Sequence, residues 1–143
     1  EEAGSVKDVE ITEVDIDNFI RAKGAIFSAI RTMLASLDFD VTMIEHVYVA
    51  GGIGSGINMR NAVNIGMFPD ISLEKFHYIG NSSLTGAYLM LLSTPAEKKT
   101  YELASNMTYM ELSAVPTYMD EFVGACFLPH TDTTLFPDVH IKA

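Results

Sequence analysis

Cysteine is nearly absent: the 143-residue sequence contains only Cys126. One thiol excludes an internal disulfide, a four-thiolate zinc site and an iron–sulfur cluster held by this chain alone. So little cysteine is typical of a protein from a reducing compartment, and we therefore expect a cytoplasmic location.

Basic residues are also few. Nine Lys and Arg stand against nineteen Asp and Glu, which gives a formal net charge of −10. Nucleic acid and anionic membranes are bound through clustered cations, and the sequence has no such cluster. We therefore expect neither kind of partner. Seven of the acids precede residue 18, and we treat residues 1–10 as an acidic N-terminal segment.

The sequence has no long apolar run and no basic-then-apolar region typical of a signal peptide. Its longest uninterrupted apolar stretch, Ala87 to Leu92, is far shorter than the roughly 18 residues of a membrane-spanning helix. The chain begins Glu-Glu-Ala without an initiator methionine, so we interpret it as a piece of a longer protein. Hydrophobic residues nevertheless make up 48% of the chain, which predicts one folded domain over residues 11–143.

The apolar spacing and the turn residues predict an α/β unit. Thr12 and Asp15 form the pattern of a capping box at the start of a long helix. Five helices are predicted in all, over residues 13–37, 57–65, 82–91, 95–105 and 116–128. Gly66 and Pro69 end the second of them, and Ser82 is the expected cap of the third.

Three segments have the character of strands. Residues 46–50 and 76–79 are short, apolar or aromatic, and followed by glycine, which predicts buried parallel strands joined by a helix. Residues 107–112 are a third, weaker candidate. A sheet of two or three strands usually needs further partners, which we expect outside this chain.

The glycine-rich segment Val47 to Gly56 is the most informative in the sequence. A strand that leads into several glycines gives a turn bare enough for a nucleotide to lie against. The dinucleotide fingerprint G-x-G-x-x-G fails, because its sixth position is Ile57 or Met59 in the two possible frames, and no P-loop lysine follows. Tight packing between strand and helix is the alternative explanation.

Two cations, Arg21 and Lys23, stand in a predicted helix that is otherwise mostly apolar. A solvated stripe is their simplest interpretation. Gly24 follows them, and a glycine inside a helix usually marks the close approach of a ligand or of another backbone.

The remaining polar and sulfur-containing residues give weaker signals. His46, His77, His130 and His140 have no metal-ligand spacing, so we expect them to be structural or exposed and expect no metal site. His130-Thr-Asp132 has the residues to orient a proton carrier, but a turn that ends a helix is the better interpretation. The eight methionines are expected to lie mainly in the core.

Five ordered blocks together resemble the C-terminal part of the reductive activators of corrinoid proteins. The resemblance covers almost the whole chain from Ile11, which makes it more specific than a single glycine cluster. The blocks are Asp15 to Ile26, Val47 to Ser55, Ile65 to Asp70, Tyr78 to Ala87 and Phe127 to His130.

The resemblance implies both a fold and an activity. Members of that family couple ATP hydrolysis to the return of an inactivated cobalt(II) corrinoid to cobalt(I), with electrons from an iron–sulfur domain. Their ATP domain is similar to those of sugar kinases, heat-shock chaperones and actin. The implied fold class is α/β, the second lobe of an actin-like ATPase domain, with a small and mostly parallel sheet and flanking helices.

The resemblance also implies an adenosine site. In the wider superfamily a Gly-Gly turn after a strand lines the adenosine, and in the chaperones an Arg-Ala-Lys stretch on a helix lies against it. A second strand-to-helix turn lies near the same site. The expected cofactor-binding residues here are Arg21, Lys23, Gly24, Gly51, Gly52, Gly54, Ser55, Asn81 and Gly86.

Parts of the family pattern are missing from this chain. It lacks the cluster-binding cysteines, the Asp-Gly-rich phosphate loops and the catalytic carboxylate, so no catalytic residue is assigned here. Ile53 stands where an aromatic residue is common, which we expect to alter packing only. ATP with magnesium, and the iron–sulfur cluster, are therefore expected as cofactors of a longer parent protein.

We thus expect the adenosine-binding lobe of an ATP-dependent activator that serves a methyltransferase system. Its expected partners are the corrinoid protein, an electron donor to the parent protein and a second copy of the chain in a homo-oligomer. Two alternatives remain open: a non-catalytic docking or dimerisation module for the corrinoid protein, and a kinase-like enzyme with a small substrate.

Overall fold

A long helix, α1 (Glu13–Ser36), opens the part of the chain that the computed structural model describes, residues 10–139. The Thr12 hydroxyl accepts a hydrogen bond from the Asp15 backbone N–H, and the Asp15 carboxylate accepts one from the Thr12 N–H. These bonds satisfy donors that the start of a helix leaves free. The predicted long helix and its capping box are both confirmed.

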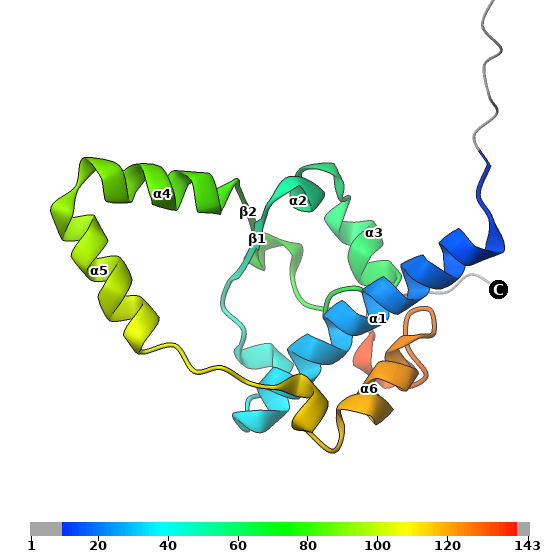
Figure 1. Ribbon diagram of the computed structural model, residues 1–143. Coiled ribbons are helices and arrows are strands. Elements are labelled where there is room, and N and C mark those ends of the chain that lie inside the picture. Colours follow the sequence, from blue (N-terminus) through cyan, green and yellow to red (C-terminus); the bar gives the residue numbers. More distant parts are fainter. Residues whose placement is uncertain (1–9, 140–143) are drawn as a thin grey trace, which may run out of the picture.

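The elements after α1 alternate between strand and helix and then continue as helices. They are β1 (Val47–Ala50), α2 (Gly52–Gly56), α3 (Met59–Asn64), β2 (Phe76–Gly80), α4 (Ser82–Leu92), α5 (Thr94–Ser105) and α6 (Tyr118–Ala125). α6 packs along α1, whereas α4 and α5 form an arm that extends away from this pair (Figure 1). Among residues 10–139, none of the helices combines the length and the apolar character needed to cross a membrane.

The two strands form a small parallel sheet. Val47 lies opposite Phe76 and Tyr48 opposite His77, with a register shift between Val49 and Ala50. α2 and α3 connect the strands, so the predicted parallel crossover is confirmed. The prediction of buried strands is wrong for this chain, because half-buried and exposed residues alternate along β1, and Tyr48 is 62% exposed.

The third predicted strand is not formed. Within residues 10–139 the sheet has only β1 and β2, and residues 107–111 are irregular before a short 3-10 turn at Leu112–Ala114. Met107 and Tyr109 are 78% and 82% exposed. A strand exists only through pairing, and this segment lies against no sheet edge, so its apolar and aromatic character alone does not make one.

Two helix starts also differ from expectation. The predicted helix over 57–65 is replaced by α2, which begins directly after the glycine turn, and by α3, which Asn58 caps by accepting from the Asn61 N–H. α4 is capped by Asn81 rather than by Ser82, since the Asn81 side chain accepts from the Leu84 N–H. In both cases an asparagine takes the capping role.

The main core lies between α1, α6 and the segment that follows α6. Phe27, Ala125 and Phe136 are each at most 3% exposed, and the two phenylalanine rings lie 5.2 Å apart between centroids. Methionine contributes little, which corrects the expectation of a methionine-rich core. Met67 is buried, but four of the eight methionines are 44–78% exposed, namely Met33, Met43, Met107 and Met119.

Lys23 is the unusual member of this core. Its side chain is 0% exposed, and its Nζ donates to the backbone carbonyl of Phe127 and, at 2.7 Å, to that of Pro129. Burial lowers the Lys23 pKa from 10.5 to about 8, against a smaller opposing effect of Cys126. Lys23 therefore ties α1 to a segment more than 100 residues later in the chain.

Replacing this ammonium group should destabilise the chain. Lys23→Met leaves the carbonyls of Phe127 and Pro129 without their donor, and we expect the free energy of unfolding to fall by about 2 kcal/mol. The measurement is urea unfolding followed by far-ultraviolet circular dichroism. Arg21→Met, on the exposed side of the same helix, is the matched control and should change it by less than about 0.5 kcal/mol. Equal effects of the two substitutions would contradict the role of Lys23.

The lowered pKa of Lys23 predicts a dependence on pH. Between the folded pKa of about 8 and the ordinary value of 10.5, the unfolded chain holds more protons than the folded one. The free energy of unfolding should therefore rise with pH in this window, relative to the Lys23→Met variant. Urea unfolding of both proteins at pH 7.5, 9 and 10.5 measures the difference, and a constant difference would argue against a buried, titrating lysine.

Candidate functional site

The glycine turn lies where the two parallel strands end. Gly51 follows β1 with a φ of +85°, and Gly80 ends β2 with a φ of +67°. The Gly51 N–H donates to the Gly80 carbonyl at 2.8 Å, so the two strand ends turn away side by side. Both positions need glycine because side chains disfavour a positive φ.

Gly52 and Gly54, also in this turn, differ from Gly51 because neither has a positive φ. A Cβ on Gly54 would lie 2.7 Å from the Tyr78 ring and 2.9 Å from Val49, so α2 packs directly on the sheet through Gly54. A Cβ on Gly52 would meet no atom of the described residues within 4 Å, and the φ of Gly52 is not positive. Neither conformation nor packing against the described residues 10–139 therefore requires glycine at position 52.

Ser55, Asn81 and Gly86 complete this end of the sheet. Ser55 donates its hydroxyl to the Gly52 carbonyl at 2.7 Å and is exposed. Asn81 follows Gly80 directly, and its side chain is occupied in capping α4. Gly86 lies one turn into α4 and would admit a Cβ freely. The structure thus brings Gly51, Gly52, Gly54, Ser55 and Asn81 together, with an open surface over Gly52.

Arg21, Lys23 and Gly24 all lie on α1. Lys23 and Gly24 face α6 and the segment that follows it. The expectation that Lys23 is an exposed cation is wrong. Its ammonium group donates to the carbonyls of Phe127 and Pro129, after α6, and is not directed at the glycine turn. A Cβ on Gly24 would lie 3.1 Å from the Cys126 sulfur, so the close approach it marks here is that of α6. Arg21 is exposed.

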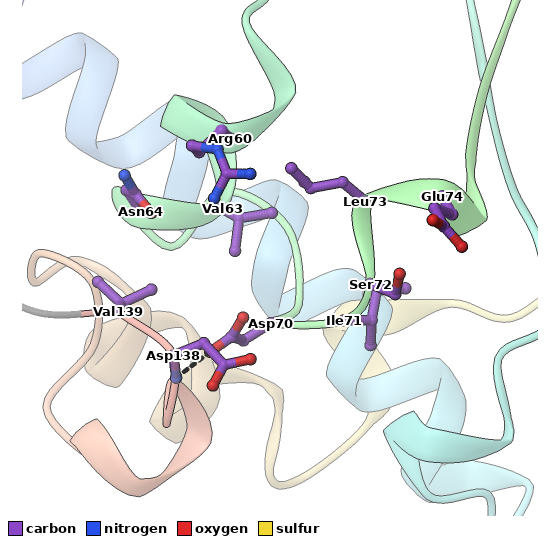
Figure 2. A pocket seen from close by; sticks show the side chains of 10 residues that line it. All are labelled: Arg60, Val63, Asn64, Asp70, Ile71, Ser72, Leu73, Glu74, Asp138 and Val139. Atoms are coloured by element: carbon purple, nitrogen blue, oxygen red, sulfur yellow. Dashed lines mark hydrogen bonds between the residues drawn. The ribbon is translucent and has the colours of Figure 1, made fainter.

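A cavity of about 410 Å³ lies elsewhere, beside α3, and sequence reasoning did not identify it. Figure 2 shows Arg60 and Asn64 on one wall and the carboxylates of Asp70 and Asp138 opposite, where the Asp138 N–H donates to Asp70 Oδ2 at 2.8 Å. Its residues come from 60–74 and 138–139, segments that no local pattern connects. Three carboxylates against one cation make the lining acidic.

Three of the four histidines, His46, His77 and His130, lie in the part of the chain that the structure describes. His46 and His77 lie side by side, with Nδ1 and Nε2 2.9 Å apart, on the sheet. Between residues 10 and 139, no group of three His, Cys, Asp or Glu side chains is placed to hold a metal ion. Asp132 caps the 3-10 turn Thr133–Leu135, which supports the turn interpretation of residues 130–132. His140 lies outside the described residues.

Comparison with known proteins gives consistent matches. A family model described as the C-terminal domain of RACo, the ASKHA domain, matches residues 1–140. A solved structure of a reductive activator for corrinoid, iron-sulfur protein is similar with a TM-score of 0.85 and 54% identity, over 90% of this chain and 20% of that one.

Two curated relatives are more distant. The corrinoid activation enzyme RamQ of Eubacterium limosum is 29% identical over 117 residues, which are 82% of this chain and 20% of the relative. A Co(II) methylated amine-specific corrinoid protein reductase of Methanosarcina barkeri is 28% identical over 100 residues, 70% of this chain and 18% of the relative. The chain thus spans about a fifth of the length of each of these proteins.

The small parallel sheet, its flanking helices and the match over almost the whole chain give one conclusion. This chain belongs to the RACo family and is a C-terminal ASKHA domain, an actin-like α/β lobe.

Proposed function

We propose that this chain is the adenosine-binding lobe of a longer, ATP-dependent activator that returns an inactive cobalt(II) corrinoid protein to cobalt(I) in methyl-transfer metabolism. Three similar proteins carry names that describe corrinoid activation or corrinoid reduction, which supports the substrate class. An electron donor and an iron–sulfur cluster would act in the remainder of that activator.

The surface over Gly52 is the observation that carries the nucleotide role. In α/β sheets, ligands bind outside the carboxyl ends of the parallel strands, and Gly51 and Gly80 stand at those ends. Gly52 lies at the same edge of the sheet, and neither its conformation nor its packing explains why this residue is a glycine. A close approach by the flat ribose or base of a ligand supplies the missing reason.

This lobe would bind and orient, and the chemistry of the phosphates would lie elsewhere. The open turn fits the apolar face of an adenosine, whereas the three acidic residues of the α3 cavity fit a polyphosphate poorly. Magnesium and the phosphate groups would be held by the remainder of the longer activator. ATP supplies the free energy of hydrolysis, and closure of two lobes on it would change how the activator holds its corrinoid partner.

Exposed apolar side chains on α4 support the proposal that this lobe is part of a longer protein. On α4, five large apolar side chains are 51–86% exposed: Leu84, Tyr88, Leu89, Leu91 and Leu92. Several large, exposed apolar side chains on one helix are typical of a surface that another protein surface covers. The remainder of the longer activator would cover it, since that remainder makes up about four-fifths of the relatives.

The same patch also favours the second candidate function, a docking module that grips the corrinoid protein without binding nucleotide. The two functions differ in what α4 contacts. In the docking function, Leu91→Asp in the longer activator would abolish binding of the corrinoid protein and leave ATP binding unchanged. In the nucleotide function, the decisive position is Gly52.

The test of the nucleotide function is Gly52→Val in the longer activator. A side chain at this position would occupy the place proposed for adenosine, and we expect ATP binding to weaken at least tenfold, about 1.4 kcal/mol. The rate of cobalt(II) reduction should fall at low ATP concentration. The thermal midpoint without ligand should change little, because a Cβ at position 52 meets no atom of the described residues within 4 Å.

Gly54→Val is the matched control. Its Cβ would meet the Tyr78 ring at 2.7 Å, so this variant should lose about 1–3 kcal/mol of stability through overpacking. Calorimetric titration with ATP and thermal unfolding separate the two effects. If Gly52→Val binds ATP as tightly as the parent protein, the adenosine role fails and the docking function replaces it.

A further inference from the structure

Residues 127–136, here named the clasp, close over the buried face of α1. Lys23 donates to two carbonyls of the clasp, those of Phe127 and Pro129. The rings of His130 and Phe136 lie 5.4 Å and 5.2 Å from the ring of Phe27. The clasp therefore seals the main core, and its release would expose Phe27.

His130 holds a defined protonation state within the clasp. The residue is only 9% exposed, and its Nδ1 accepts a hydrogen bond from the Asp132 backbone N–H at 2.9 Å. An accepting Nδ1 carries no proton, so the proton of the neutral ring is on Nε2. Nε2 is itself buried and has no hydrogen-bond partner among residues 10–139.

A second proton on this ring would have to go to Nδ1. There it would face the Asp132 N–H, so an accepted hydrogen bond would become a contact between two donors. The His130 ring packs closely on α6 at Gly124, since a Cβ built on that glycine would lie only 3.0–3.1 Å from the ring atoms. Charging His130 thus removes a hydrogen bond of the closed clasp and weakens the closed arrangement.

The charges around His130 act in both directions. Lys23 and Arg31 on α1 disfavour the imidazolium, while Glu121 on α6 and Asp132 in the clasp favour it. A small cavity of about 290 Å³ lies beside His130, and Asp120 also lines it. Burial is the largest influence, and it lowers the His130 pKa below the ordinary 6.5.

We propose that the clasp is an acid-sensitive latch: proton uptake by His130 releases residues 127–136 from α1 and frees Lys23 from its two carbonyls. In the released clasp His130 titrates as an ordinary histidine, so release takes up one proton. Closure is favoured above pH 6.5 and weakens as the pH falls from there toward the folded pKa. The latch does not depend on nucleotide.

The test measures hydrogen exchange of the Asp132 amide in the 143-residue chain by NMR, between pH 7.5 and 5.5. After correction for intrinsic exchange, the opening equilibrium should rise by up to tenfold per pH unit below pH 6.5, as uptake of one proton requires. His130→Asn keeps an acceptor oxygen near the position of Nδ1 but does not titrate, and its opening should be independent of pH. His77→Asn, on β2, is the control and should behave as the parent chain.

Two results would overturn the latch. One is an opening equilibrium that does not change with pH in the parent chain, and the other is the same pH dependence in His130→Asn. If His130→Asn does not fold, the ring proton shifts of His130 in the parent chain replace it. Their titration must then share one midpoint with the opening of the Asp132 amide, and separate midpoints would reject the proposal.

Discussion

The contact between α1 and the clasp that follows α6 holds together the two ends of the described chain. Its centre is a buried ammonium group, that of Lys23, which donates to the Phe127 and Pro129 carbonyls. Gly24 allows α6 to approach at the next position of α1, and Phe27 lies one turn further along. A charge in this place is costly, as the lowered Lys23 pKa shows, but a carbonyl without a donor would be costly as well.

Local signals predicted the local parts of this fold. The Thr12–Asp15 capping box, the parallel strand pair and the helix that begins near Pro95 each follow from residues close together in the sequence. Prediction from the sequence was wrong where the structure depends on contacts between distant residues. Residues 107–112 have strand character but no sheet edge to join, and four of the eight methionines that were expected in a core are exposed.

The same division applies to the candidate site. The glycine pattern after β1 predicted a bare turn, and the structure separates the reasons for its glycines: conformation at Gly51, packing at Gly54 and neither at Gly52. The Arg21-Ala-Lys23 stretch was a weaker guide, because a lysine in a helix shows nothing of the carbonyls, some 100 residues away, that its ammonium group binds. The acidic cavity beside α3 also joins distant segments, which no short motif could reveal.

The proposed function depends on an adenosine that lies against the surface over Gly52. A crystal structure of the longer activator with a non-hydrolysable ATP analogue tests it most directly. We expect the ribose or base within van der Waals contact of the Gly52 Cα, beside the Gly51 and Gly80 turns. Adenosine bound in the cavity of Arg60, Asp70 and Asp138, or a protein side chain filling the space over Gly52, would contradict it.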